Sequence, residues 1–175
     1  FERIVRLKQI RDRYESFEKN KIIQIMSQLR HHLINMDEID KICKQINEHE
    51  RFIAYGSPTL LNLLFDFQVD MKIFDKTVLL SSVNNGKILV PKNNDLIGLF
   101  TATGRLLGCC DAKFQEVVLD TKNTKILFSK SQINSEYIDF SFSMDTDNDY
   151  YEMHYVFLFL FDLIKTRYYE LYIKE

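Results

Sequence analysis

The chain is short of the residues that interrupt regular structure. Its 175 residues include five Gly, two Pro and no Trp, and the first Gly and the first Pro are Gly56 and Pro58. Gly and Pro weaken or end helices, so the stretch before them has nothing to break it. The sequence therefore predicts a helical arm over residues 1–50, built as two helices, followed by a domain over residues 51–175.

Cysteine is also scarce, with Cys43, Cys109 and Cys110 as the complete set. Adjacent cysteines in a strand point to opposite faces, so a bridge between Cys109 and Cys110 would be strained. An odd and sparse set predicts reduced thiols in a nuclear or cytoplasmic protein. No spacing of Cys with His resembles a zinc site, and we expect neither a metal ion nor a cofactor.

Long apolar runs and a strong net charge are absent as well. The longest apolar run, Tyr155–Phe161, is too short for a bilayer, which takes about 20 helical residues, so we expect no membrane span. A net charge of −2 argues against general attraction to nucleic acid. The basic residues between positions 3 and 13 leave open one hypothesis, salt-dependent binding of nucleic acid. The chain begins with Phe1 and shows no signal peptide, which predicts a fragment or a processed chain.

Apolar side chains in the arm recur at spacings of three and four. This pattern predicts one stripe on an amphipathic helix, although Arg11, Glu18 and Lys21 interrupt it, so a long regular coiled coil is not expected. We predict that a protein partner covers the stripe and forms a hetero-oligomer with this chain. The predicted partner-binding residues of the arm are Ile4, Leu7, Tyr14, Phe17, Ile22 and Ile25.

A second helix is predicted from Asn35 onward. Asn35 and Glu38 have the spacing of a capping box. We expect this helix to pack on the domain, and a single continuous helix through the arm is the alternative. Its apolar stripe consists of Met36, Ile39, Ile42, Cys43 and Ile46.

The domain shows patterns typical of strands. Leu63–Ile73 alternates apolar and polar residues with period two, which favours a strand that covers a core on one side. Asn84-Asn85-Gly86 predicts a hairpin turn between strands at Thr77–Val83 and Lys87–Val90. Residues 92–112 remain open between strand and helix.

Three more strands and a closing helix complete the predicted domain. The fold class that follows is α+β, with a mostly antiparallel sheet between the N-terminal helical arm and a closing C-terminal helix. The additional strands are predicted at Phe114–Leu119, Thr124–Phe128 and Tyr137–Met144, and the closing helix at Tyr150–Ile173.

An acidic cluster near the C-terminal helix has part of a calcium-loop pattern. Asp145, Asp147 and Asp149 alternate as the first calcium ligands of such a loop do. However, Tyr150 stands where the loop needs Gly, and Val156 where it needs Glu. We therefore expect an acidic loop here and not a metal site.

A second set of acidic residues suggests an enzymatic function, which we keep as the alternative hypothesis. Asp111, Asp120 and Lys122 have the residue types of a metal-dependent nuclease or phosphodiesterase, in which two acids hold a cation near a lysine. The same residue types are common at turns, which weakens the argument. No other catalytic signature occurs in the sequence, so the leading expectation is that the chain is not an enzyme.

Tyrosine is concentrated near the C-terminus. Tyr168, Tyr169 and Tyr172 lie on an amphipathic stretch, and tyrosine is favoured at protein interfaces. We predict that these three residues bind a partner, with packing inside the same chain as the alternative.

The order of elements resembles the RWD-type domains at the ends of coiled-coil kinetochore subunits, such as the outer-kinetochore scaffold. The resemblance rests on a helical arm, an antiparallel meander over Leu63–Met144 and a final helix at Tyr150–Ile173. It implies a non-catalytic interaction or scaffold module of a larger assembly. Such a module would bind a sister subunit through its helices and a further complex through its sheet domain.

Overall fold

The computed structural model describes residues 35–83, 88–108, 111–143 and 152–174. The chain divides into two compact units, Phe1–Ile34 and Asn35–Glu175. The predicted first arm helix, the Asn84-Asn85-Gly86 turn and the acidic loop at residues 145–149 lie outside the described residues.

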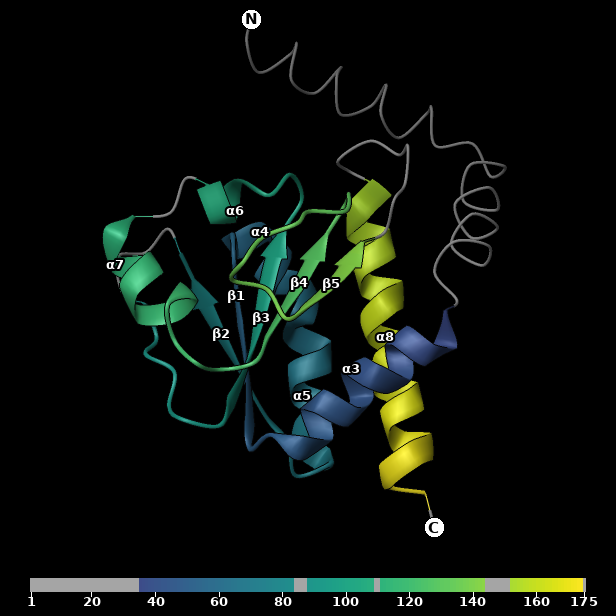
Figure 1. The fold of residues 1–175 in the computed structure, drawn as a ribbon. Helices are drawn as coiled ribbons and strands as arrows, with labels where there is room; N and C mark the ends of the chain where they lie inside the picture. Colours follow the sequence, from purple (N-terminus) through teal and green to yellow (C-terminus); the bar gives the residue numbers. More distant parts are fainter. Residues whose placement is uncertain (1–34, 84–87, 109–110, 144–151, 175) are drawn as a thin grey trace, which may run out of the picture. The chain divides into compact units, whose positions relative to one another are not determined.

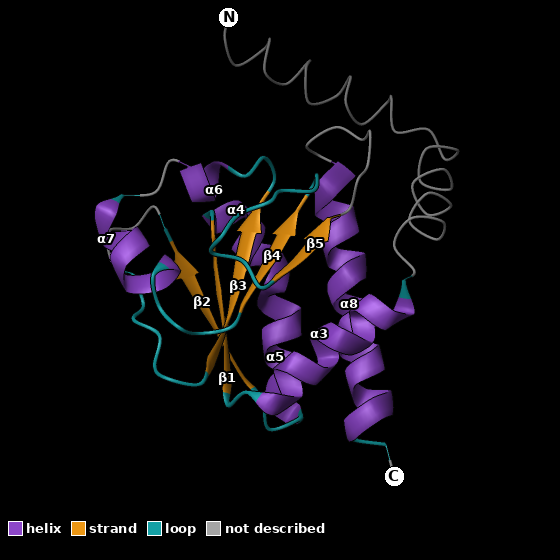
Figure 2. Ribbon diagram, in the orientation of Figure 1, coloured by secondary structure: helices purple, strands orange, loops and turns teal. Residues whose placement is uncertain are grey.

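The described chain forms one five-stranded sheet with helices on both faces (Figures 1 and 2). The strands are β1 (Arg51–Gly56), β2 (Thr77–Ser82), β3 (Asp95–Thr101), β4 (Lys125–Ser129) and β5 (Phe140–Ser143). The helical elements are α3 (Met36–Glu48), α4 (Pro58–Leu61), the 3₁₀ turn η1 (Asn62–Leu64), α5 (Phe65–Ile73), α6 (Arg105–Gly108), α7 (Ala112–Phe114), the π turn η2 (Gln115–Leu119) and α8 (Glu152–Tyr172). No helix among these is long and apolar enough to cross a membrane.

Every strand pair in the sheet is parallel, in the order β2-β1-β3-β4-β5. The predicted α+β class with a mostly antiparallel sheet is therefore wrong, and the fold is α/β. Parallel neighbours need crossover connections, which α4–α5 supply after β1 and α6–η2 after β3. Strands buried on both faces form continuous apolar runs instead of alternating patterns. Such runs occur at Phe52–Tyr55, Leu96–Phe100 and Ile126–Phe128.

The segment Leu63–Ile73 is helical, so the predicted strand there is wrong. Its period-two pattern arises because apolar residues occupy two opposite faces of the helix that η1 and α5 form. One set is buried at spacings of three and four, as a helix requires, and the other set faces solvent. The buried residues are Leu64, Phe67 and Met71, and the exposed residues are Phe65, Val69 and Ile73.

The predicted hairpin of Thr77–Val83 with Lys87–Val90 and the predicted strand at Phe114–Leu119 are also wrong. Thr77–Ser82 forms a strand, but it pairs in parallel with β1. Phe114–Leu119 is helical and packs Phe114 and Val118, four residues apart, against the sheet. The predicted strands that became β4 and β5, the closing helix α8 and the second arm helix α3 are confirmed.

Helices α3, α5 and α8 cover one face of the sheet (Figure 1). Aromatic side chains pack between this face and the helices. Phe100 of β3 and Phe128 of β4 stack with ring centroids 4.7 Å apart. Phe161 of α8 packs on both of these rings and on Phe67 of α5. Phe67 in turn contacts Phe52 of β1 edge to face. The aromatic cluster therefore ties three strands to two helices.

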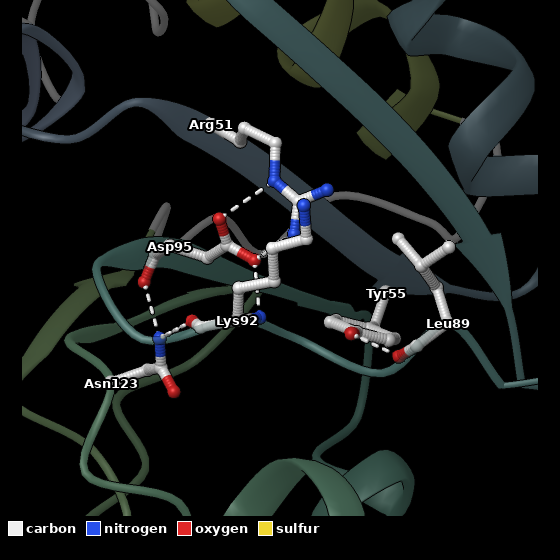
Figure 3. Close-up of polar contacts among 6 residues, drawn as sticks. All are labelled: Arg51, Tyr55, Leu89, Lys92, Asp95 and Asn123. Atoms are coloured by element: carbon white, nitrogen blue, oxygen red, sulfur yellow. Dashed lines mark hydrogen bonds and ion pairs between the residues drawn. The ribbon is translucent and has the colours of Figure 1, made fainter.

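The opposite face is covered by α7 and η2. Tyr55 of β1 meets Phe114 in a T-shaped contact at 5.7 Å, and Val118 completes the buried cluster against Ile97. The Tyr55 hydroxyl donates to the carbonyl of Leu89 at 2.6 Å (Figure 3). This bond fixes the segment that crosses from β2 to β3.

Helix α3 is held on α8 by polar contacts as well as by its apolar stripe. Arg167 donates to both carboxylate oxygens of Asp40, at 2.7 and 3.1 Å. The Tyr168 hydroxyl donates to the side-chain oxygen of Asn47 at 3.0 Å. Cys43 donates to a backbone carbonyl of α8, and burial raises the pKa of its thiol to about 12. The second predicted arm helix thus packs on the domain, as expected.

An ion pair closes the amino ends of β1 and β3 (Figure 3). Arg51 is the first residue of β1 and Asp95 the first residue of β3, and the two are paired in the register of the sheet. Arg51 Nε donates a hydrogen bond to Asp95 Oδ1 at 2.8 Å, and a second guanidinium nitrogen donates to Asp95 Oδ2. The backbone N–H of Lys92 donates to Oδ2 at 2.6 Å, and Asn123 donates to the carbonyls of Lys92 and Asp95. Burial opposes ionisation of Asp95, but the bonds from Arg51 and Lys92 outweigh it and hold the pKa of Asp95 below its usual value.

Gly98 in β3 provides a test of the packing between β1 and β3. A Cβ there would lie 2.5 and 2.6 Å from two ring carbons of Phe52 and 2.9 Å from one of Phe100. We expect Gly98→Ala to lower the free energy of unfolding by about 1–3 kcal/mol, because these rings must shift to admit the methyl group. Gly108→Ala is the matched control, since nothing lies within 4 Å of a Cβ at that position. Urea denaturation measures both variants, and equal midpoints would contradict the packing.

The lowered pKa of Asp95 makes stability depend on pH. A carboxyl whose pKa is lower in the folded state stabilises the fold above its unfolded-state pKa of about 3.9, and this stabilisation is lost as the pH falls through the folded-state pKa. We expect Asp95→Asn to lower the free energy of unfolding by about 3 kcal/mol at neutral pH, because Arg51 loses its charge partner. The difference from the wild type should shrink as the solution is acidified below about pH 4.

Denaturant titrations at neutral and acid pH measure this difference in the free energy of unfolding. Glu136→Gln removes an exposed carboxyl and serves as the control, with no comparable loss at neutral pH. A difference between Asp95→Asn and the wild type that stayed constant with pH would contradict the assigned role of the ion pair.

Candidate functional site

The carboxyl ends of the strands meet at one edge of the sheet, which we call the carboxyl edge (Figure 1). β1 and β3 are neighbours there, but the chain leaves them toward opposite faces. After β1 it continues into α4 and α5 on the face of α8, and after β3 into α6 and α7 on the other face. In open parallel sheets, ligands bind beside such a reversal, at the carboxyl ends of the strands.

The segment after β1 brings backbone and hydroxyl groups to the carboxyl edge. A Cβ at Gly56 would lie 3.1 Å from Cβ and O of Phe100, so the two strand ends approach closely. Ser57 caps the helical run that begins at Pro58, and its hydroxyl oxygen accepts a bond from the N–H of Leu60 at 3.5 Å. Thr59 is exposed on the first helical turn. The first turn of a helix favours negatively charged groups.

The segment after β3 presents a hydroxyl and a cation. Thr103 and Arg105 are exposed, and no described carboxylate lies within ion-pair distance of Arg105. Between them Gly104 adopts a φ of +75°, a left-handed conformation that favours glycine. A Cβ at Gly104 would also lie 2.7 Å from Ile133 Cδ1, so the turn is close-packed. The left-handed turn at Gly104 therefore sets the positions of the exposed residues Thr103 and Arg105 on either side of it.

The segments after β3 and β4 are held side by side. Thr101 and Ser129 are paired in the register of the sheet. The backbone N–H of Lys130 donates to the carbonyl of Ala102 at 3.3 Å, and the Ser129 hydroxyl donates to the carbonyl of Ser131 at 2.7 Å. The hydroxyl groups of β4's end thus lie next to the Thr103–Arg105 turn.

The chemistry of the carboxyl edge is that of an anion and polyol site. The described segments after β1, β3 and β4 (residues 57–59, 102–105 and 130–132) contain hydroxyls, amides, one Arg and one Lys, and no Asp, Glu or His. Arg and backbone N–H groups bind phosphate oxygens, and hydroxyls bind other hydroxyls as donors or acceptors. The arrangement therefore suits a ligand that carries both a phosphate and several hydroxyl groups.

The predicted nuclease residues do not form a site. Asp111 accepts a bond from the backbone N–H of Phe114 at 2.7 Å and caps α7. Asp120 lies at the far end of the helical segment 112–119, roughly 10 Å away by the rise of a helix, and Lys122 follows it. Among the residues that the structure describes, no group of side chains could hold a metal ion. The alternative function as a nuclease is wrong.

The predicted partner-binding tyrosines differ in exposure. Tyr168 is 1% exposed and its ring stacks on Phe74, and burial raises the pKa of its hydroxyl to about 12. Tyr169 and Tyr172 are 43% and 39% exposed on α8. The predicted contact of these residues with a partner stays a prediction, as does that of the six arm residues, which lie outside the described part of the chain.

The residues of the carboxyl edge were not predicted from the sequence. The signal is present in two places, where a continuous apolar run is followed by small polar residues and then by a helix. One is Phe52–Tyr55 before Gly56-Ser57-Pro58, and the other is Leu96–Phe100 before Thr101–Gly104. Such a strand, turn and helix succession is typical of ligand sites in parallel sheets.

No protein-family model and no curated protein sequence matches this chain. Solved structures do match it. One match is the hypothetical protein MJ1247 from Methanococcus jannaschii, for which a molecular function as 3-hexulose-6-phosphate isomerase was inferred from its structure. The alignment covers 85% of this chain and 87% of the matched chain, with a TM-score of 0.67 and 14% sequence identity. The NanR protein of Vibrio vulnificus, solved with ManNAc-6P, aligns over 96% of this chain and 68% of its own with a TM-score of 0.66 and 10% identity.

A third match is the C-terminal domain of glucosamine-fructose-6-phosphate aminotransferase from Francisella tularensis. The alignment covers 85% of this chain and 43% of the matched chain, with a TM-score of 0.60 and 20% sequence identity. These likenesses show that the chain has the α/β fold of phosphosugar isomerase-like domains. The resemblance to RWD-type kinetochore domains is wrong, because those were expected to carry an antiparallel meander and this sheet is parallel throughout. The non-catalytic scaffold module of a coiled-coil kinetochore subunit, which that resemblance implied, is therefore wrong as well.

Proposed function

We propose that the chain binds a phosphorylated sugar at the carboxyl edge, between the segments that follow β1 and β3. The observation that carries the proposal is the reversal of the chain between these two strands, with hydroxyl and N–H groups after β1 and a hydroxyl and a guanidinium group after β3. The matched structures support it, because their descriptions name a sugar-phosphate isomerase, bound ManNAc-6P and a hexose-phosphate aminotransferase.

The phosphate group fits between the first helical turn after β1 and Arg105. The N–H and hydroxyl of Thr59 lie on that turn, and the positive end of the helix dipole favours an anion there. Arg105 is exposed and lies on the other departing segment. A guanidinium that is not already paired with a carboxylate adds a strong charge-assisted bond to phosphate.

The sugar portion fits toward the end of β4. Thr103 and Ser131 are exposed hydroxyl residues on the two neighbouring segments. Hydroxyl side chains both donate and accept, so they can match a row of sugar hydroxyls without a fixed pattern of polarity. This part of the site would discriminate among sugars less strictly than the phosphate end.

The described residues favour binding over isomerisation. Interconversion of an aldose and a ketose requires a base that moves a proton between neighbouring carbons. The described segments after β1, β3 and β4 contain no carboxylate and no His to act as that base. We therefore propose a sugar-phosphate-binding domain as the first candidate and a sugar-phosphate isomerase, which the matched structures suggest, as the second.

Calorimetric titration tests the binding site directly. We expect ManNAc-6P, glucosamine 6-phosphate or fructose 6-phosphate to bind, and unphosphorylated ManNAc to bind far more weakly. Arg105→Gln should weaken binding by roughly 10- to 100-fold, the loss expected for one charge-assisted hydrogen bond. Lys122→Gln changes the net charge equally but lies outside the carboxyl edge, and should leave the affinity unchanged. Failure of every phosphorylated sugar to bind, or equal losses in both variants, would contradict the site.

Proton NMR distinguishes the two candidate functions. Fructose 6-phosphate incubated with the protein should keep the spectrum of the starting sugar, at the rate of change seen without protein. Conversion to an aldose phosphate well above that background would favour the isomerase and would contradict the first candidate.

A further inference from the structure

Strand β5 (Phe140–Ser143) lies at one edge of the sheet, with β4 on its inner side (Figure 1). Successive residues of a parallel strand direct their main-chain N–H and C=O groups alternately toward a neighbour and away from it. The N–H of Asp139 donates to the carbonyl of Lys125 in β4 at 3.1 Å, so Asp139 and Ser141 pair with β4. Phe140, which lies between them, therefore directs its N–H and C=O away from the sheet. No other described residue bonds to these two groups, and we call them the open edge.

Neither a charge nor a proline of β5 protects the open edge. Charged residues, prolines or a covering segment commonly protect edge strands, but β5 consists of Phe and Ser alone. Phe140 is 41% exposed, whereas Phe142, the next residue that faces away from β4, is 4% exposed, so the opening is centred on Phe140. At the opposite edge strand β2, the Gln68 side chain of α5 donates to the carbonyl of Val78 at 2.7 Å. The edge at β5 is thus more accessible to a further strand than the edge at β2.

A groove of about 250 Å³, which we call the apolar groove, lies between β5 and α3. Ile42 of α3 and Phe140 and Phe142 of β5 give it apolar surface. Side chains alternate between the two faces of a strand, so Phe140 and Phe142 point to the same face. The charged residues that α3 adds to the lining, Glu38 and Lys41, are exposed and opposite in sign. This groove therefore suits an apolar side chain.

A second groove, of about 490 Å³, lies along the other face of β5, and we call it the acidic groove. Its lining includes Ser141 and also Ile133 and Ile138, which pack against the core cluster on the η2 side of the sheet. Glu136 and Asp139 line it and are exposed, and its lining contains no Lys or Arg. Two carboxylates without a neighbouring cation favour a basic side chain in this groove.

An added strand would place its side chains alternately in the two grooves. Neighbouring strands lie about 4.8 Å apart, and residues level with each other point to the same face. A residue level with Phe140 would point to the apolar groove, and the residues before and after it to the acidic groove. An apolar residue between two basic ones meets both requirements. Strand β5 of a second copy does not, because it contains no basic residue.

We propose that β5 is a docking edge for an extended segment of a partner protein in which apolar and basic residues alternate. The segment adds a sixth strand to the sheet. Main-chain bonds to Phe140 contribute affinity, and the two grooves on either side select the side chains. Strand β4 separates β5 from β3, so the proposal does not depend on sugar-phosphate binding between the ends of β1 and β3.

Fluorescence anisotropy with a labelled peptide tests the docking edge. The probe is Lys-Val-Lys-Val-Lys-Val-Lys, titrated with the full chain. We expect saturable binding, and binding at least about tenfold weaker for a peptide of the same composition in which the lysines and valines form two blocks. Both peptides have the same charge, so the comparison separates strand addition from general attraction to acidic residues. Failure of the alternating peptide to bind, or equal binding of both peptides, overturns the proposal.

N-methylation of the probe tests the main-chain bonds. In a strand, alternate residues direct their N–H groups to the same neighbour, so either the valine or the lysine N–H groups face β5. Methylation of the facing set should weaken binding by roughly tenfold or more, and methylation of the other set by less than about threefold. Equal effects of the two methylated peptides overturn strand addition.

Two pairs of protein variants test the residues of the edge. Phe140→Pro removes the N–H of the open edge at a position where proline is tolerated, and should weaken binding by roughly tenfold relative to Phe140→Val. Glu136→Lys should weaken binding by roughly three- to tenfold, whereas Glu116→Lys, the same change at an exposed residue of η2, should not. Circular dichroism confirms that the variants are folded. Equal affinities within both pairs overturn the proposal, as does a dimer that Phe140→Pro dissociates, because a second copy would then occupy the edge.

Discussion

The parallel pairing of β1 with β3 is the contact on which the rest of the structure depends. Three features hold it along its length. At the amino ends Arg51 and Asp95 form a partly buried ion pair, and in the middle the Phe52 ring occupies the space that a side chain at Gly98 would take. At the carboxyl ends Gly56 approaches the backbone of Phe100. The pairing therefore brings the two strand ends level, so that the segments leaving them toward opposite faces begin at the same edge of the sheet.

The two edges of the sheet consequently have different chemistry. At the amino edge the charged groups are satisfied within the chain, since Asp95 accepts bonds from Arg51 and Lys92, and Asn123 donates to nearby carbonyls. At the carboxyl edge the hydroxyls of Thr59, Thr103 and Ser131 and the guanidinium of Arg105 are exposed, and no described carboxylate forms an ion pair with Arg105. Exposed polar groups at this edge are available to a ligand, which is why the carboxyl edge is the site we propose.

Part of this fold could be predicted from the sequence, and the failures have identifiable causes. The stripe of α3 and the long apolar segment of α8 were sufficient to predict both helices. Helix α5 was predicted as a strand because Phe65, Val69 and Ile73 are apolar without being buried, which produces an alternation of period two. Strand β1 was missed because no element was assigned between the end of the predicted arm at residue 50 and the predicted strand that begins at Leu63. The site depends on which strands are neighbours, and single-strand patterns do not contain that information.

We propose that a sugar phosphate binds between the ends of β1 and β3. The most direct measurement is a titration of the isotopically labelled chain with ManNAc-6P, followed through backbone amide chemical shifts in NMR spectra. We predict that the amides of Thr59, Thr103 and Arg105 shift most, while those of Lys92 and Asn123 at the amino edge stay unchanged. Shifts confined to the amino edge, or no shifts at a large excess of the sugar phosphate, would contradict the claim.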